Sequence, residues 1–160
     1  MKRDDIESHW NELLEVINSV ENRDEFLVII GDTNRHLGSI IPGNNDKVSY
    51  GGELIKTLLE TEKYVLMNAS EKLRGGIWTR IDPADADIKS VLDLVIVSTD
   101  LMKYVESLET DSSRKFTPFK RNNDNTLSFP DHFAILLTLK GMPLMKRNKL
   151  GRKPIKWNTN

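Results

Sequence analysis

The amino-acid sequence predicts a layered sandwich of the α/β or α+β class, in which helices cover a mixed sheet. Two observations predict it. Short apolar runs rich in β-branched residues are typical of buried strands, and other segments carry apolar residues at helical spacing. The chain has 160 residues, of which 38% are hydrophobic, so we expect one domain with a sizeable core.

The first predicted element is an amphipathic helix that begins near Asp4 or Asp5, either of which could cap it. Its apolar residues, spaced for one buried face, are Ile6, Trp10, Leu13, Leu14, Ile17 and Val20. After a charged turn comes the apolar run of residues 26–30, which is too short for a helix. We interpret this run as a strand that is buried on both faces and ends at Gly31.

Residues 39–50 contain a cluster of turn formers and are predicted to form a loop. A helix should follow, with a buried stripe made of Leu54, Ile55, Leu58 and Leu59. Residues 64–67 are predicted as a short strand, and residues 77–80 as another after a turn at Gly75 and Gly76.

Residues 91–97 and 132–139 are the remaining long apolar runs, and both are predicted as strands. Between them, we expect a helical turn over residues 99–104 and an edge strand over residues 105–110. Residues 114–129 are polar and are predicted as a long loop.

The C-terminal segment is basic. It contains no acidic residue between positions 140 and 156, and its basic residues there are Lys140, Lys146, Arg147, Lys149, Arg152, Lys153 and Lys156. We therefore divide the chain into a domain over residues 1–140 and a basic tail or linker over residues 141–160. A solvated linker is the interpretation that we favour, with phosphate contacts as the alternative.

Composition excludes several classes of site. The formal net charge of -1 gives no overall attraction to nucleic acid, so polyanion contacts must come from local clusters of basic residues. The absence of cysteine excludes disulfides, thiolate zinc sites and thiol catalysis. The N-terminus lacks the apolar run of a signal peptide, and no stretch is long enough to span a membrane. We therefore expect an intracellular protein without a membrane partner, in the nucleus or the cytoplasm.

The first candidate site follows the first predicted strand. Residues two apart in an extended chain project to the same side, so Asp32 and Asn34 are expected to face one site. A carboxylate beside a carboxamide can hold a hard cation or activate water while donating a hydrogen bond to a phosphoryl oxygen. The alternative is turn chemistry, because these residue types also dominate turns.

Asp93 interrupts the apolar run of residues 91–97. It is expected to share one face with Val91, Val95 and Val97, while Leu92, Leu94 and Ile96 occupy the other. A carboxylate in such a strand is costly unless it is paired or hydrogen-bonded. The position therefore requires a partner, which is either structural, such as an arginine, or functional.

Asp131 and His132 stand at the start of the last predicted strand. Adjacent strand residues point to opposite faces, so the two are expected to have different roles. One arrangement makes His132 the partner that Asp93 requires, with the carboxylate fixing the imidazole tautomer and favouring its protonated form. Asp131 would then be left for a metal ion. A satisfied loop pair is the alternative for an isolated Asp-His.

The order of these three motifs resembles the signature of the endonuclease/exonuclease/phosphatase family. Gly-Asp-x-Asn after an apolar strand is followed by Leu-Asp-Leu-Val-Ile-Val-Ser and then by Asp-His before a final apolar strand. The likeness extends from about residue 4 to residue 139. Residues 31–36, 78–80 and 89–93 are most similar to the endonuclease of non-LTR retrotransposon polyproteins. The implied fold is the second half of the four-layer sandwich typical of DNase I and exonuclease III.

The resemblance also implies hydrolysis of a phosphodiester with Mg²⁺ or Mn²⁺ as cofactor, and DNA rather than RNA as the favoured substrate. Asp32 would orient or deprotonate the attacking water and share in metal binding with Asp131. Asn34 would hydrogen-bond the scissile phosphate. Oriented by Asp93, His132 would hydrogen-bond or protonate a phosphate oxygen.

Trp78 and Arg80, on the predicted strand before Asp93, are candidates for nucleic-acid contact through stacking and phosphate pairing respectively. Core packing is the alternative for Trp78.

The sequence departs from the family pattern in two places. Pro130 replaces the serine or threonine that usually precedes Asp-His, and the first half of the family's domain has no counterpart before Gly31. That half carries the principal metal-binding glutamate, and Glu25, Glu53 and Glu60 lie in the wrong contexts to replace it. Three hypotheses therefore remain: an active endonuclease, a non-catalytic remnant that binds partners or self-associates, and a half-domain complemented by a separate N-terminal half.

Overall fold

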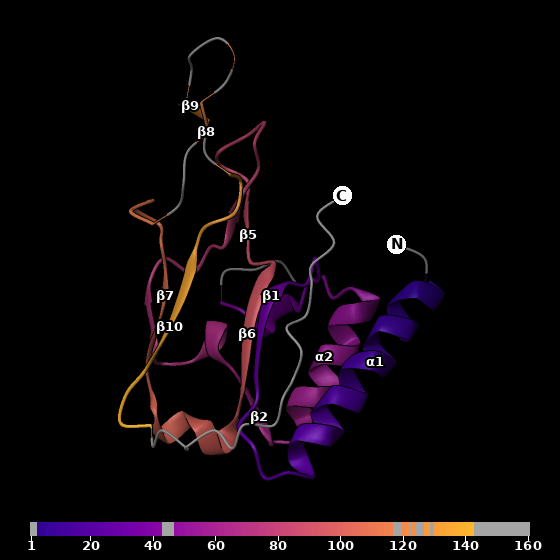
Figure 1. The fold of residues 1–160 in the computed structure, drawn as a ribbon. Helices are drawn as coiled ribbons and strands as arrows, with labels where there is room; N and C mark the ends of the chain where they lie inside the picture. The colour runs from indigo at the N-terminus through magenta and orange to yellow at the C-terminus, as the bar shows by residue number, and fades with distance from the viewer. Residues whose placement is uncertain are drawn as a thin grey trace.

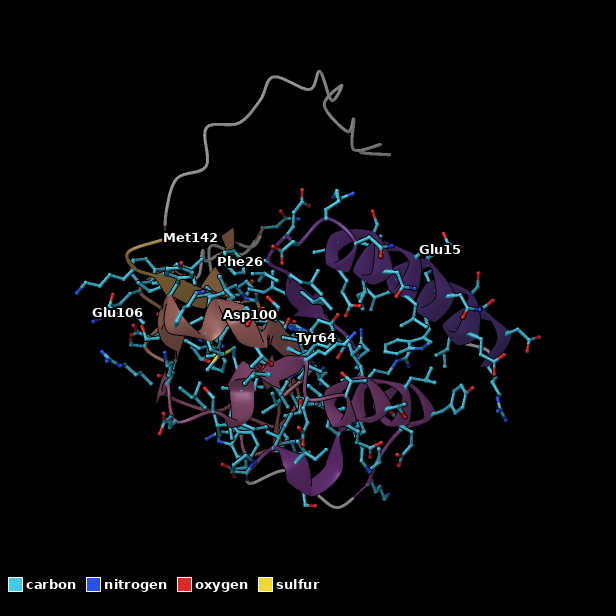
Figure 2. The ribbon with its side chains drawn as sticks, turned by 90° about the horizontal axis from the view of Figure 1, so that it is seen from below. Glu15, Phe26, Tyr64, Asp100, Glu106 and Met142 are labelled. Carbon is cyan, nitrogen blue, oxygen red and sulfur yellow. The ribbon has the colours of Figure 1, made fainter. Side chains whose placement is uncertain are left out.

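The computed structural model shows a mixed α+β fold built in layers (Figure 1). A three-stranded central sheet lies between helices on one face and a three-stranded outer sheet on the other. Figure 2 shows the helices together on the same side of the strands. The structure describes residues 3–42, 47–116, 120–121, 123, 127–128 and 130–142.

The α-helices among the described residues are α1 (Arg3–Glu21) and α2 (Tyr50–Glu60), and they confirm the helices predicted from apolar spacing. Because α1 begins at Arg3, Asp4 and Asp5 lie inside its first turn, where negative charge stabilises the helix dipole. The Oγ atom of Ser49 caps α2 by accepting a hydrogen bond from the backbone N–H of Gly52 at 3.2 Å. Neither helix is long and apolar enough to cross a membrane.

The central sheet has the strand order β1-β6-β2. Its middle strand, β6 (Asp93–Ser98), pairs antiparallel with both β1 (Val28–Asp32) and β2 (Tyr64–Leu66). These strands confirm the predicted runs to within about two residues at their ends. β1 begins two residues later than predicted and includes Gly31.

β1 is an edge strand of the central sheet, and it is not buried on both faces as predicted. Val28 and Ile30 are 40% and 53% exposed, and they project to the same face as their partners Val97 and Val95 on β6. That face is directed toward the outer sheet, which does not extend over β1. An apolar run indicates a strand but does not reveal whether both of its faces are covered by other elements.

The outer sheet has the strand order β10-β7-β3. β7 (Val105–Thr110) pairs antiparallel with β10 (Ile135–Leu139) and parallel with β3 (Leu73–Gly75). β7 is therefore the central strand of this sheet, and not the edge strand that its sequence indicated. β3 was not predicted, because its three residues have no strand pattern.

Two apolar cores lie on opposite faces of β6. Leu94 and Ile96 pack with the helices, whereas Val95 and Val97 pack toward the outer sheet. This confirms the alternation predicted for the strand. Val91 differs, because it precedes β6 and joins the helix-side core instead of sharing a face with Val95.

Several short elements complete the described structure. The 3-10 helices are η1 (Gly38–Ile40), η2 (Met67–Ala69) and η3 (Thr99–Lys103), the last of which confirms the helical turn predicted there. Two small antiparallel pairs join β4 (Arg80–Ile81) to β5 (Lys89–Ser90) and β8 (Lys120–Arg121) to β9 (Leu127–Ser128).

Three predicted segments have different bounds or contents in the structure. The strand expected over residues 77–80 begins only at Arg80, and the strand expected over residues 132–139 begins only at Ile135. The loop expected over residues 114–129 contains the β8-β9 pair. Residues 143–160, most of the predicted basic tail, lie outside the described residues.

Candidate active site

Asp32 and Asp93 lie opposite each other in the central sheet. Asp32 is the last residue of β1 and Asp93 the first of β6, and the antiparallel register pairs them directly. Side chains opposite each other on antiparallel strands project to the same face. Two sequence motifs that are about sixty residues apart therefore meet at one end of the sheet.

His132 reaches the same place from the segment before β10. Its Nδ1 atom lies 2.7 Å from Oδ2 of Asp93, whose side chain is 14% exposed. This is the partner that the sequence predicted for a carboxylate in an apolar strand. A carboxylate at this distance favours a proton on Nδ1 and so directs the other ring nitrogen, Nε2, outward as the reactive one.

Two more carboxylates flank Nε2 of His132. Oδ2 of Asp32 lies 3.9 Å from it and Oδ2 of Asp131 lies 4.0 Å from it. Both distances exceed a hydrogen bond, so these carboxylates act on the ring through charge. The structure thus places Asp32, Asp93 and Asp131 around the imidazole of His132, so four of the five predicted catalytic and metal-binding residues lie together. Asn34 is the fifth, and it contacts Asp32.

Asn34 holds the Asp32 carboxylate with two hydrogen bonds. Its backbone N–H donates to Oδ1 and its Nδ2 donates to Oδ2, both at 2.9 Å. The backbone of Asn34 is left-handed, with φ of 49°, a conformation that asparagine tolerates better than most residues. The sequence predicted that Asn34 contacts a phosphate, whereas here its amide orients Asp32.

Arg80 is paired with Asp131. Its Nε atom donates to Oδ2 of Asp131 at 2.9 Å, and this hydrogen bond lowers the pKa of the Asp131 carboxyl below its ordinary value. Arg80 also forms an isolated β-bridge with His132. The residue predicted for nucleic-acid contact and the residue predicted for metal binding are therefore partners of each other.

Thr79 supports the site and was not singled out from the sequence. It is fully buried, and its Oγ1 atom accepts hydrogen bonds from the backbone N–H groups of Leu92 at 2.9 Å and Asp93 at 3.0 Å. Its carbonyl oxygen accepts from the N–H of Phe133 at 2.8 Å. One threonine thus fixes the main chain beside both Asp93 and His132.

Asn68 is a second supporting residue that the sequence analysis missed. Its buried side chain accepts from the N–H of Val95 at 2.8 Å and donates to the carbonyl oxygen of Asp93 at 3.1 Å. It takes the place of a strand neighbour where β2 ends. A buried asparagine or threonine has no spacing signature, which is why neither was found.

Trp78 lies in a different environment from the other candidates. Its side chain is partly buried and packs against the helix-side core. This contact favours core packing for Trp78, the alternative considered from the sequence. Stacking on a nucleic-acid base stays a prediction.

Asp32 and Asp131 are the two residues that the sequence analysis assigned to a metal ion. No group of three or more histidine, aspartate or glutamate side chains among them has metal-binding geometry. Asp32 and Asp131 can each supply a carboxylate oxygen, but Oδ2 of Asp131 is bonded to Arg80. Mg²⁺ is usually bound by one or two carboxylates together with phosphate oxygens and water. A cation held by Asp32 and Asp131 would complete its coordination with phosphate oxygens and water.

Comparison with known proteins adds no relative, since no family model and no curated protein matches the chain. Functional assignment therefore depends on the geometry of the site and on its motifs. Together, the residues provide an oriented imidazole, a carboxylate held by amide donors and one guanidinium. These groups suit acid-base chemistry on an anionic substrate.

Proposed function

We propose that this chain carries the water-orienting and phosphate-contacting part of a divalent-metal-dependent phosphodiesterase site, with DNA as the favoured substrate. The observation that carries the proposal is the cluster around His132, whose Nδ1 lies 2.7 Å from Asp93 and whose Nε2 lies 3.9 Å from Asp32. This is the grouping that the motif order of endonuclease/exonuclease/phosphatase proteins implies. The motifs also resemble those of the non-LTR retrotransposon endonuclease.

Each side chain has a defined task in the proposed reaction. Asp32, oriented by the two N–H donors of Asn34, accepts a hydrogen bond from the attacking water and takes its proton. His132 donates from Nε2 to a phosphate oxygen, and Asp93 stabilises the imidazolium form that makes this possible. The proposed base, Asp32, and the proposed acid, His132, therefore lie side by side.

Charge explains why a cation belongs to this proposal. Asp32, Asp93 and Asp131 carry three negative charges, against one fixed positive charge on Arg80. This excess of negative charge weakens the binding of a phosphodiester, which is an anion. When bound, Mg²⁺ or Mn²⁺ would neutralise charge on the phosphoryl oxygens.

Among the described residues no strand pairs with the outer edge of β1, and this edge supports a proposal that a second polypeptide completes the domain. At one end of β1 the carbonyl oxygen of Leu27 accepts from the N–H of Ser98 at 3.0 Å, and at the other end the N–H of Thr33 donates to the carbonyl oxygen of Leu92 at 2.9 Å. Because backbone groups alternate in direction along a strand, these two bonds show which residues of β1 face β6. The N–H and C=O groups of Val28, Ile30 and Asp32 consequently point away from β6. An extended segment can pair with them, supplied by a complementing N-terminal half or by a second copy. The four-layer sandwich of the family would require such an addition.

A cleavage assay with supercoiled DNA tests the enzyme proposal. We expect Mg²⁺-dependent nicking by the chain alone or by the chain mixed with an N-terminal half from a related endonuclease. Asp32→Ala and His132→Ala should abolish it, whereas Asp100→Ala, in η3 just beyond the opposite end of β6, should not. Nicking that survives in Asp32→Ala would disprove the assignment of the site.

The second candidate is a binding module without catalytic activity. The exposure of Val28 and Ile30 on the edge strand favours it, because exposed apolar edges promote association. Absence of cleavage both alone and with an added N-terminal half would select this function. The chain would then act through its fold and its self-association.

A further inference from the structure

The ion pair between Arg80 and Asp131 is fixed by the main chain as well as by charge. Nε of Arg80 lies 2.9 Å from Oδ2 of Asp131, and the two side chains are 27% and 35% exposed. The N–H of Ile81 donates to the carbonyl oxygen of Asp131 at 2.9 Å, and Arg80 bridges to His132. The geometry of the pair is therefore set by the pairing of its two backbone segments.

One carboxylate oxygen lies close to two nitrogen-bearing groups. Oδ2 of Asp131 accepts from Arg80 and lies 4.0 Å from Nε2 of His132. The guanidinium and the imidazole are therefore both neighbours of this oxygen. An anion that reaches Nε2 of His132 also comes close to Arg80.

Arg80 retains donors that the pair does not use. A guanidinium has five N–H donors, and the structure assigns the one on Nε to Asp131. Among the residues that the structure describes, none accepts a hydrogen bond from its two terminal nitrogens. A planar guanidinium presents these donors as a fork that matches two oxygens of a phosphoryl group.

We propose that Arg80 is an anion-binding residue of the site and that Asp131 is its positioning residue. The ligand class is a phosphoryl group, either as a monoester or within a phosphodiester. In this arrangement Asp131 orients Arg80 and does not bind a metal ion, which differs from the role that the sequence indicated. The inference rests on the proposed function only in placing a phosphoryl group beside His132.

The sign of one substitution separates this role from simple electrostatics. Asp131→Asn removes a negative charge near the site, which by Coulomb attraction alone would strengthen anion binding. If Asp131 positions Arg80, the same substitution weakens anion binding, because the guanidinium loses its orientation. The two explanations therefore predict opposite changes in the dissociation constant for phosphate.

The test is a titration with inorganic phosphate in the presence of EDTA, followed by NMR of the chain labelled with ¹⁵N-arginine. We expect the Arg80 side-chain signals to shift in the millimolar range of phosphate. Arg80→Lys and Asp131→Asn should each raise the dissociation constant about tenfold, and Asp131→Asn should add little in the Arg80→Lys background. Arg74→Lys, on the exposed strand β3, is the matched control and should have no effect.

Three results would overturn the inference. They are the absence of a phosphate-dependent change at Arg80, unchanged binding in Arg80→Lys, and tighter binding in Asp131→Asn. Thermal unfolding of each variant shows whether it is folded before its binding is compared. The assay contains no metal and measures no cleavage, so it can fail while Asp32-dependent nicking succeeds, or succeed while nicking fails.

Discussion

Asp93 and His132 are 39 residues apart in the sequence, and Oδ2 of Asp93 lies 2.7 Å from Nδ1 of His132. Asp93 is the first residue of β6 and His132 lies just before β10, so the pair connects the central sheet to the segment that enters the outer sheet. The contact satisfies a carboxylate that is 14% exposed. It also leaves Nε2 as the ring nitrogen that can act on a ligand.

Asp93→Asn should change the tautomer of His132. The carboxylate can only accept a hydrogen bond from Nδ1–H, whereas a carboxamide can also donate to that nitrogen and so favours a proton on Nε2. Long-range ¹H–¹⁵N NMR spectra of the imidazole report this directly. In any sample that cleaves DNA, the rate should fall roughly 100-fold or more. Asp100→Asn is the control, and an unchanged tautomer in Asp93→Asn would refute the assigned pair.

Two substitutions at Asn34 separate its backbone role from its side-chain role. Asn34→Gly accepts the φ of 49° and removes the donor to Asp32, while Asn34→Ala removes the same donor and strains the backbone. Asn34→Ala should therefore have a free energy of unfolding about 1 kcal/mol below that of Asn34→Gly. Urea denaturation measures this difference. Equal stability of the two would show that the left-handed backbone is not a constraint.

Asp131 should make stability depend on pH in the acid range. Its hydrogen bond with Arg80 lowers the pKa of the folded state, so the stabilisation is fully present above the unfolded-state pKa of about 4. It is lost as the pH falls through the lower pKa of the folded protein. Asp131→Asn should remove this contribution, so the gap between wild type and variant should close on acidification below about pH 4. Urea denaturation at a series of pH values measures the gap, and a constant gap would contradict the pairing.

The Asp93–His132 pair could be predicted because the sequence poses a physical problem there. A carboxylate within an apolar strand needs a partner, and His132 stood at the start of another apolar run. Local periodicity, which a single sequence records well, reveals the need for a partner. The convergence of Asp32 with Asp93 depends on the pairing of β1 with β6, and only the family resemblance implied it.

The Arg80–Asp131 pair could not be predicted in the same way. The two residues are 51 positions apart, and each is a surface charge with many available partners. The edge position of β1 was missed for a similar reason, since it depends on which strands are neighbours. Sheet order and charge pairing between distant segments are properties of the tertiary fold, and apolar spacing does not encode them.

Thr79→Val should destabilise the fold through two lost acceptor contacts. The variant keeps the shape of the side chain but leaves the N–H groups of Leu92 and Asp93 without their acceptor. An unsatisfied buried donor costs about 1–3 kcal/mol, so the free energy of unfolding should fall by at least that amount. Thr79→Ser retains the hydroxyl and should recover most of the loss. Calorimetric or urea unfolding of the pair decides the matter, and equal stability of both variants would exclude a hydrogen-bonding role.

Ile30→Lys should suppress association through the edge of β1. Ile30 is 53% exposed, and its backbone groups point away from β6, so a charged side chain there opposes pairing with an added strand. We expect sedimentation velocity to show concentration-dependent association for the wild type and less for Ile30→Lys.

Ile88→Lys is the matched control for this substitution. Ile88 is 56% exposed and immediately precedes β5, away from the edge of β1. Both variants add one positive charge and remove one exposed isoleucine, so a general effect on solubility would change them alike. Only a loss of association confined to Ile30→Lys assigns the contact to β1. The same variant should also weaken complementation by an N-terminal half, because that half would need the same backbone groups.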